Sequence, residues 1–270
     1  MKDKVVVITG ATSGIGRAIA NTFGLRGSKI FITGRNPDAL DQTIQELSAK
    51  QIIVRGMVAD VAVEEDNKKT IEAVIENFGK IDVLICNAGV GMRALFEELD
   101  LSVFNQVMNT NFTSVVAITK FALPHILKSK GSIVGISSIN GRRSTPARTA
   151  YSASKFAMEG FLESLRTEVM NRGVHVLSVC PGFTASNIRN KALNASGKSQ
   201  GESPRNEEKM MTAESVAELT YRAIADRKRD LILTTQGKLA VFLNKWVPSI
   251  MDKLVYNIMS KEPDSPLKKS

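Results

Sequence analysis

Near its start, the chain places a short apolar strand directly before a glycine-rich turn and a helix. Residues 4–9 are mostly β-branched and apolar, which indicates a buried parallel strand. Gly10, Gly14 and Gly16 follow, and helical spacing begins at about residue 14. At such a junction the helix N-terminus can bind the pyrophosphate of a dinucleotide. The spacing differs from the commoner Gly-x-Gly-x-x-Gly fingerprint, and three loop glycines in an ordinary βα junction are the alternative.

Strand-like and helix-like segments alternate along the rest of the chain. Apolar strand-like runs fall at residues 4–9, 28–33, 52–58, 81–86, 131–137, 174–180 and 229–234. Helical patterns fall at about 14–26, 37–50, 64–78, 98–128, 150–172 and 213–227. This alternation predicts an α/β fold, a Rossmann-like doubly wound parallel sheet of about seven strands with helices on both faces. A length of 270 residues and a hydrophobic content of 43% suit a single domain, expected over residues 1–262.

Tyr151 and Lys155 are one helical turn apart, and Ser138 precedes the tyrosine by thirteen residues. Residues four apart on a helix project from the same face. An ammonium about 4 Å from a phenolate contributes about 4 kcal/mol at an effective dielectric near 20. That is enough to lower a tyrosine pKa by about three units. We therefore predict that Lys155 brings the pKa of Tyr151 near neutrality, where a phenol can donate and accept protons. Taken alone the pair is a weak signal, because any surface helix can carry one.

Together these segments resemble the short-chain dehydrogenase/reductase family over residues from about 4 to 190. The matching positions are Thr9, Gly10, Gly14, Ile15, Gly16, Asp60, Asn87, Ala88, Gly89, Asn111, Ser138, Tyr151, Lys155, Pro181 and Gly182. The resemblance implies an oxidoreductase that interconverts a ketone and a secondary alcohol by hydride transfer to or from a nicotinamide.

The resemblance also implies catalytic roles. Tyr151 would be the general acid in ketone reduction and the base in alcohol oxidation. Lys155 would lower the pKa of the tyrosine and bind the nicotinamide ribose. Ser138 would hydrogen-bond the substrate oxygen and stabilise its developing charge. Adjacent Ser137 is the competing candidate, although the spacing favours Ser138.

Two asparagines and two histidines complete the polar candidates. Asn111 fits the family position that supports a water relay near the lysine, and Asn109 is the less favoured alternative. His125 and His175 have no partner at catalytic spacing, so we predict that both are structural.

The end of the second predicted strand bears on the choice of cofactor. An acidic residue there would bind the ribose hydroxyls of NAD, but this chain has Gly34 followed by Arg35. Arg35 can bind a 2′-phosphate and stack on adenine, and Arg17 would add positive charge. NADP is therefore the predicted cofactor and NAD the less favoured one. A plain loop arginine is the alternative interpretation of Arg35.

Further cofactor contacts are implied by the resemblance. Asp60 matches a residue that contacts the adenine amine, and Pro181 with Gly182 begins a loop near the carboxamide. The element at 87–89 matches the family, except that Cys86 stands where an asparagine is usual. The predicted cofactor-binding set is Gly10, Thr12, Ser13, Gly14, Ile15, Gly16, Arg35, Asp60, Val61, Asn87, Ala88, Gly89, Tyr151, Lys155, Pro181, Gly182 and Thr184. Ser186 is a weaker candidate, and no metal is predicted.

The C-terminal third carries the expected substrate-binding segments. Residues 190–209 are rich in Ser, Gly, Asn and Lys and predict a mobile loop. By the family resemblance this loop belongs to a substrate lid at about 184–212, and a surface insertion is the alternative. Residues 237–260 predict amphipathic helices, which Pro248 kinks or divides. Their apolar stripe consists of Leu239, Phe242, Leu243, Trp246, Ile250, Leu254 and Ile258. Residues 263–270 are predicted to be a disordered tail.

The charge of these helices permits two interpretations. The chain has a net charge of +9, and the stripe is accompanied by Lys238, Lys245, Lys253 and Lys261. This pattern permits contact with a membrane surface. A helix packed over the substrate pocket or on a partner subunit is favoured. The tail resembles that of 11-beta-hydroxysteroid-dehydrogenase-like reductases, which act on bulky apolar ketones.

Composition argues against several other classes. Lys and Arg are scattered rather than clustered with aromatic residues, so nucleic acid is not an expected partner. No apolar run approaches the roughly 20 residues of a membrane span, and the early first strand leaves no room for a secretory signal, which favours the cytoplasm. Cys86 and Cys180 are expected to be buried free thiols. The family resemblance implies a homodimer or homotetramer through the helices at about 98–128 and 150–172.

Three hypotheses about function follow. The favoured one is an NADP-dependent carbonyl reductase or alcohol dehydrogenase acting on an apolar, lipid- or steroid-like small molecule. The enzymatic alternative is a 3-oxoacyl or 3-ketosphinganine reductase. A catalytically silent, dinucleotide-sensing binding protein is the third hypothesis. It predicts loss of Tyr151 or Lys155, and both are present.

Overall fold

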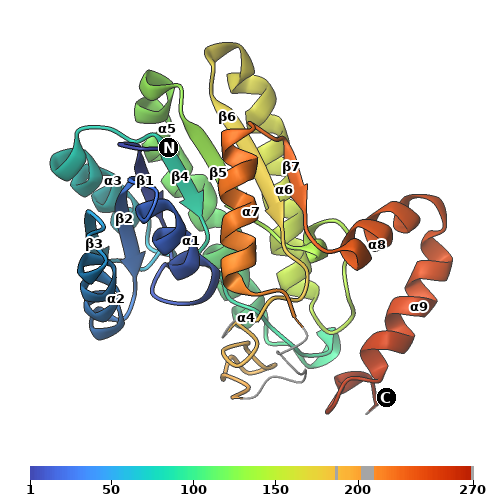
Figure 1. The fold of residues 1–270 in the computed structure, drawn as a ribbon. Coiled ribbons are helices and arrows are strands. Elements are labelled where there is room, and N and C mark those ends of the chain that lie inside the picture. Colours follow the sequence, from blue (N-terminus) through green and yellow to red (C-terminus); the bar gives the residue numbers. More distant parts are fainter. Residues whose placement is uncertain (186–187, 202–209, 269–270) are drawn as a thin grey trace.

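A parallel sheet forms the centre of the molecule. The computed structural model describes residues 1–185, 188–201 and 210–268. Within those residues seven strands pair in the order β3-β2-β1-β4-β5-β6-β7 (Figure 1). They are β1 (Val5–Ile8), β2 (Lys29–Gly34), β3 (Val54–Val58), β4 (Val83–Cys86), β5 (Ser132–Ile136), β6 (His175–Cys180) and β7 (Asp230–Ile232). The predicted Rossmann-like α/β fold is confirmed, and each strand starts and ends within two residues of its predicted limits.

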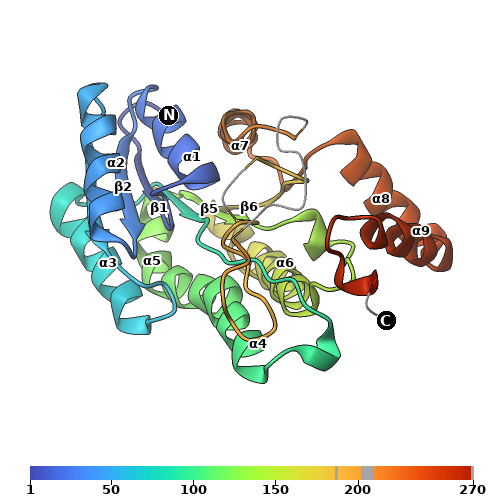
Figure 2. The same cartoon turned by 90° about the horizontal axis from the view of Figure 1, so that it is seen from below.

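Helices cover both faces of the sheet, as Figure 2 shows from below. The helices of the described residues are α1 (Gly14–Gly24), α2 (Pro37–Ala49), α3 (Glu64–Phe78), α4 (Leu101–Met108), α5 (Ser114–Ser129), α6 (Thr149–Val169), α7 (Ala213–Ala225), α8 (Thr235–Trp246) and α9 (Pro248–Ser260), of which α8 and α9 lie away from the sheet. One hydrophobic core joins the sheet to α1, α2 and α7, and a second joins it to α3, α5 and α6.

Strand β1 shows why the sheet is buried on both sides. All four of its residues are fully buried, as expected for a central parallel strand. Because side chains alternate along a strand, Val6 and Ile8 enter the core under α1 and α7. Val5 and Val7 enter the core under α3, α5 and α6.

The order of the strands creates a crevice beside β1. The chain moves outward from β1 to β2 and β3, and then returns to place β4 on the other side of β1. In doubly wound folds such a reversal leaves an opening at the carboxyl ends of the two central strands. Ile8 pairs with Ile85 near those ends, so the glycine turn after β1 and residues 87–89 after β4 meet there.

The long helix predicted at about 98–128 contains an irregular turn. After α4, residues Asn109–Thr113 form one turn of π-helix before the chain continues as α5. Such wide turns insert an extra residue and recur at functional sites. Here the wide turn contains Asn111, which is fully buried.

The C-terminal segment lies apart from the sheet. Helices α8 and α9 are separated at Pro248 and extend away from the sheet (Figures 1 and 2). Among the described residues of the tail, Pro266–Lys268 form one 3-10 turn, and disorder of the tail in solution stays a prediction. Glu262 is buried with ion pairs to Arg93 at 3.5 Å and Arg148 at 3.4 Å, and the Ser265 hydroxyl donates to the carbonyl of Met259. The partners of Glu262 come from distant loops, so the local sequence does not reveal them.

Candidate active site

The glycine turn after β1 packs tightly on the segment after β4. Gly10 has a φ of +63°, and a Cβ atom there would lie 2.8 Å from the Cα of Ala88. A Cβ on Gly16 would lie 2.4 Å from Nδ2 of Asn87. That same Nδ2 donates hydrogen bonds to the carbonyls of Thr9 and Gly10, each at 2.9 Å. Glycine is therefore required at both positions, and Asn87 fixes the shape of the turn.

The N-terminus of α1 is open to an anion. Ser13 precedes the helix, and its side chain makes no capping hydrogen bond. The first turn of α1 contains no acidic residue. The unpaired amides and the positive end of the helix dipole therefore face the crevice without a competing carboxylate. Gly14, with a φ of +54°, has no side chain to obstruct the approach. These residues fit a dinucleotide pyrophosphate.

The residues after β2 and β3 lie at the same edge of the sheet. A Cβ on Gly34 would lie 2.4 Å from Cγ2 of Thr12, so close packing keeps an acidic side chain out of this position. Arg35 is largely exposed, and its Nη1 is 3.9 Å from Oδ2 of Asp60. Val61, the next residue, is buried. Arg17 pairs with Glu46 on α2, which partly neutralises the positive charge expected from it.

The predicted residues after β6 also lie at this edge. The carbonyl of Pro181 accepts a hydrogen bond from Ile139 N at 3.0 Å, which joins the segment to the turn after β5. Thr184 is buried and donates to the carbonyl of Gly182 at 3.2 Å. Ser186 lies outside the described residues.

Asn111 and Lys155 meet beside Gly89. A Cβ on Gly89 would lie 3.2 Å from Oδ1 of Asn111 and 3.7 Å from Nζ of Lys155. Oδ1 of Asn111 accepts from Val90 N at 2.7 Å, and its Nδ2 donates to Val90 O at 2.9 Å and to Ser154 Oγ at 3.1 Å. Both polar atoms of the amide are therefore fixed, and they link the π-helical turn to α6.

Asn109, the alternative to Asn111, points elsewhere. Its side chain is exposed, and its Oδ1 accepts only a long hydrogen bond from Thr113 at 3.5 Å. The structure thus places Asn111, and not Asn109, beside the lysine.

Lys155 is a buried cation with a reduced affinity for its proton. Its Nζ donates to the carbonyl of Ile136 at 2.8 Å and lies 5.8 Å from the centre of the Tyr151 ring. Burial lowers the pKa of Lys155 to about 8, although the nearby charge of Glu159 opposes the shift. The ammonium therefore stays charged at neutral pH but not far above it.

The pKa of Tyr151 differs from the sequence-based prediction. Burial raises the pKa of this phenol above its usual value, and a hydrogen bond with Ser138 and the charges of Arg148 and Arg189 lower it only in part. The prediction that Lys155 brings it near neutrality is wrong for the protein chain itself. The physical reasons are that burial disfavours the charged phenolate and that the ammonium of Lys155 donates to the carbonyl of Ile136 at the end of β5.

Ser138 is the serine that interacts with Tyr151. Its hydroxyl lies close enough to the phenol to lower the pKa of Tyr151, and it accepts a hydrogen bond from Asn140 N at 3.1 Å. Ser137 is buried beneath Gly141, where its hydroxyl has no hydrogen-bond partner among the described residues. The geometry therefore favours Ser138 over Ser137.

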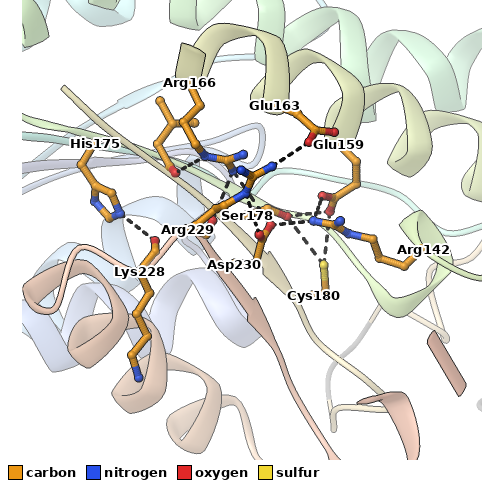
Figure 3. Close-up of polar contacts among 11 residues, drawn as sticks. Arg142, Glu159, Glu163, Arg166, His175, Ser178, Cys180, Lys228, Arg229 and Asp230 are labelled. Atoms are coloured by element: carbon orange, nitrogen blue, oxygen red, sulfur yellow. Dashed lines mark hydrogen bonds and ion pairs between the residues drawn. The ribbon is translucent and has the colours of Figure 1, made fainter. Parts of the chain in front are cut away.

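A buried carboxylate lies one turn beyond Lys155 on α6. Oε1 of Glu159 accepts from the Ser178 hydroxyl at 2.6 Å and the Cys180 thiol at 3.2 Å, and Oε2 pairs with Arg142 at 2.7 Å (Figure 3). Arg142 also pairs with Asp230 of β7 at 2.6 Å. Arg142 follows the turn at Ile139–Gly141, so this network ties the turn beside Ser138 to α6, β6 and β7.

Sequence reasoning missed the charged residues around the tyrosine and the lysine. The sequence did contain a signal for Glu159, because residues 151, 155 and 159 continue a spacing of four along one helix. Arg148, one turn before Tyr151, could be found in the same way. Arg189 gave no signal, because it comes from the loop after β6 and approaches Tyr151 only in the folded chain.

Other candidate groups are structural. His175 lies on β6, where Nε2 bonds the carbonyl of Lys228 at 2.7 Å and Nδ1 bonds the Ser132 hydroxyl at 3.2 Å. Cys86, which stands where an asparagine is usual, is buried with its Sγ 4.0 Å from the Thr119 hydroxyl. Burial raises the thiol pKa to about 12 for both Cys86 and Cys180, so neither is a reactive thiolate at neutral pH.

Comparison with known sequences agrees with this geometry. The family model described as short chain dehydrogenase matches residues 4–196. Dehydrogenase/reductase SDR family member 7B of Xenopus tropicalis is 35% identical over 258 residues, which cover 93% of this chain and 84% of that protein. Dehydrogenase/reductase SDR family protein 7-like of Dictyostelium discoideum is 34% identical, covering 96% and 83%.

Solved structures show the same fold. A short-chain dehydrogenase/reductase from Burkholderia phymatum in complex with NAD has a TM-score of 0.82 and 27% identity, covering 92% of this chain and 95% of its own. An alcohol dehydrogenase from Thermococcus sibiricus complexed with 5-hydroxy-NADP has a TM-score of 0.74 and 26% identity, covering 86% and 96%. The chain therefore belongs to the short-chain dehydrogenase/reductase family and is an NAD(P)-dependent oxidoreductase.

Proposed function

We propose that the protein interconverts a ketone and a secondary alcohol on an apolar, lipid- or steroid-like substrate, with NADP as its cofactor. The observation that carries the proposal is the approach of Lys155 and Ser138 to Tyr151, with Nζ of Lys155 5.8 Å from the centre of the phenol ring. Asn111 and Lys155 complete the group beside Gly89. The four residues come from three separate elements, and the fold brings them together at the carboxyl end of the sheet.

Each side chain has a separate task in ketone reduction. When bound, a reduced nicotinamide supplies the hydride that reaches the carbonyl carbon. Tyr151 donates its phenolic proton to the carbonyl oxygen, and its raised pKa keeps that proton available at neutral pH. Ser138 donates a hydrogen bond to the same oxygen and stabilises its developing charge. Lys155 would hold the nicotinamide ribose and favour the phenolate that remains, while Asn111 fixes the backbone at Val90 and the Ser154 hydroxyl.

The surroundings of Tyr151 support an apolar substrate. The tyrosine packs against a buried cluster formed by Met92, Ala94, Leu99, Val103, Val107, Ala150 and Leu193. Leu193 belongs to the proposed lid at 184–212, and its backbone bonds Gly91 and Arg93. A substrate held beside Tyr151 would therefore meet aliphatic side chains more often than charged ones.

Replacing the proposed acid tests the mechanism. We expect Tyr151→Phe to retain NADPH affinity, because only a hydroxyl is removed, while its kcat/KM falls by about 10²–10⁴. The measurement is NADPH absorbance with a panel of steroid and long-chain ketones, together with 3-oxoacyl thioesters. Equal rates for wild type and variant would refute the role of Tyr151. Preference for the 3-oxoacyl thioesters would favour the alternative reductase over the lipid or steroid enzyme.

The NADP proposal rests on Arg35. No acid follows β2, and the guanidinium is exposed with only a long ion pair to Asp60. The solved relatives bind NAD in one case and 5-hydroxy-NADP in the other, so the family accepts both forms. Because a charge-assisted phosphate contact contributes about 1.5–3 kcal/mol, we expect Arg35→Ala to weaken NADPH binding about tenfold or more and leave NADH nearly unchanged. Arg55→Ala on β3 is the matched control, and equal weakening of both nucleotides by Arg35→Ala would contradict the proposal.

We also propose a cytoplasmic homodimer or homotetramer that pairs through the helices at about 98–128 and 150–172, which are α4, α5 and α6. Phe156 on α6 is about half exposed, which leaves apolar surface for such a contact. Both cysteines are free, as expected in a reducing compartment. Sedimentation of the wild type and Phe156→Ser tests the interface, and an unchanged oligomer would place it elsewhere.

A further inference from the structure

Helices α8 and α9 expose large apolar side chains to solvent. Six residues of the apolar stripe, Leu239, Phe242, Trp246, Ile250, Leu254 and Ile258, are between 46% and 73% exposed. In the two helices only Gly237, Met251 and Met259 are buried. Soluble proteins rarely gather so many exposed apolar residues on adjoining elements unless the surface has a binding role.

The spacing aligns most of these residues on each helix. Leu239, Phe242 and Trp246 follow one another on α8 at intervals of three and four. Ile250 and Ile258 on α9 flank Leu254 at intervals of four. At about 100° per residue each set forms one face of its helix. Figures 1 and 2 show the two helices projecting beyond the sheet and its covering helices.

Lysines accompany the apolar stripe. Lys238 and Lys245 are seven residues apart on α8, and both are exposed next to the apolar face. Lys253 and Lys261 are exposed on and just after α9. Among the described residues none of these four lysines forms an ion pair, whereas the exposed Asp252 is paired with Arg143 at 2.8 Å. The surface is thus apolar with an uncompensated positive border.

This charge argues against a second copy of the chain as the occupant. A two-fold interface brings the same surface of each subunit together. It would therefore oppose the four lysines of one subunit to those of the other across an apolar contact. A partner with dense negative charge over an apolar interior matches both features, and an anionic bilayer has that structure.

We propose that α8 and α9 dock on the surface of an anionic lipid bilayer. The apolar stripe enters the boundary between headgroups and acyl chains, and the lysines meet the lipid phosphates. The aromatic ring of Trp246 suits this depth, because such rings favour the membrane interface. The helices have 12 and 13 residues, and no described helix is long and apolar enough to span a bilayer. They therefore lie on the membrane.

The docking surface is fixed to the rest of the molecule. Arg143 and Asp252 join α9 to the loop after β5, and buried Glu262 anchors the chain just beyond α9. At the start of α8 a Cβ on Gly237 would lie 2.5 Å from Cδ1 of Ile139, the residue after Ser138. The bilayer would therefore lie near the reactive turn. The docking itself does not depend on the proposed function.

Trp246 provides a direct probe, because it is the only tryptophan in the chain. We expect its fluorescence to shift to shorter wavelength when the full-length protein meets vesicles of phosphatidylcholine with phosphatidylglycerol. Vesicles of phosphatidylcholine alone should cause a smaller shift, and added salt should weaken the larger one. No turnover is measured, so failure here and failure of the oxidoreductase proposal are distinguishable.

Two sets of variants test the two parts of the surface. Lys245→Gln with Lys253→Gln should lower the partition constant about thirtyfold, because each lysine near an anionic surface contributes about 1 kcal/mol. Phe242→Ser with Leu254→Ser should abolish the shift while preserving the probe. Lys2→Gln with Lys69→Gln, and Leu25→Ser with Ile53→Ser, are the matched controls on other exposed positions and should bind like wild type.

Three outcomes would overturn the proposal. The first is no shift with anionic vesicles at any lipid concentration. The second is an equal shift with neutral vesicles, which would remove the role of the lysines. The third is a shift that grows with protein concentration when lipid is absent, which would identify a second copy of the chain as the occupant.

Discussion

The glycine turn after β1 and the helix pair α8–α9 are built in opposite ways. In the turn, Gly10 and Gly16 are so enclosed that a single added carbon would overlap the segment after β4. In the helix pair, most of the large apolar side chains face outward, and only Gly237, Met251 and Met259 are buried. Because the space around Gly10 and Gly16 admits no side chain, glycine is the residue that fits, and the turn can be recognised in the sequence. An apolar stripe suits a core, a partner or a membrane equally well, so its role depends on exposure.

The largest effect should come from filling the glycine turn. Gly16→Val places carbon within 2.4 Å of Asn87 Nδ2 and 2.6 Å of Gly10 O, so we expect a stability loss of about 1–3 kcal/mol and loss of dinucleotide binding. Urea unfolding and titration with NADPH measure the two effects. Gly160→Ala is the control, because nothing lies within 4 Å of a Cβ there. In that helix interior alanine should instead add about 0.5–1 kcal/mol. Unchanged nucleotide binding in Gly16→Val would contradict the tight enclosure that we infer for the glycine turn.

An effect of intermediate size on the rate of ketone reduction is expected from Glu159, which lies in the buried network that joins α6 to β6 and β7. Burial lowers the pKa of Lys155 to about 8, and Glu159 opposes that shift. Glu159→Gln removes the opposing charge, so the pKa of Lys155 falls further and its ammonium is lost at lower pH. The alkaline fall in ketone-reduction rate should therefore move to lower pH, with a loss at pH 8 of about fivefold for the first unit by which the pKa falls.

The pH profile separates this role from a structural one. Glu159→Asp keeps the charge and should retain most of the wild-type profile, whereas a general loss of packing would lower the rate at every pH. If Glu159→Gln kept the wild-type alkaline limb, Glu159 would have no influence on Lys155 during turnover.

The smallest effect on stability should come from the outer helices. Trp246 is 73% exposed, so Trp246→Ser should change the free energy of unfolding by no more than about 0.5 kcal/mol. Urea unfolding with circular dichroism is the measurement, since the fluorescent probe is gone. The same variant should bind anionic vesicles more weakly in a flotation assay. A large loss of stability would show that α8 packs on a surface of this chain or a second copy.

The same contrast explains which site residues could be predicted. Tyr151 and Lys155 are four residues apart on α6, and Ser138 comes two residues after the end of β5. These spacings could be recognised in the sequence, and the structure brings the three residues together. The ionisation of Tyr151 was predicted incorrectly, because a spacing of four fixes the side of the helix but not the direction of a flexible lysine. That direction is set by the Ile136 carbonyl, and burial sets the sign of the tyrosine shift.

The sequence by itself determined the parallel α/β fold and indicated the glycine turn after β1. The fold follows from repeating hydrophobicity and the turn from backbone clearance, which are local properties, whereas the roles of the site residues rest on the family resemblance and stay predictions. The tertiary structure alone decided the burial and ion pairs of Glu262, the approach of Arg189 to Tyr151 and the outward exposure of Trp246. These depend on contacts between segments far apart in the chain, and on which side of a helix the rest of the molecule leaves uncovered.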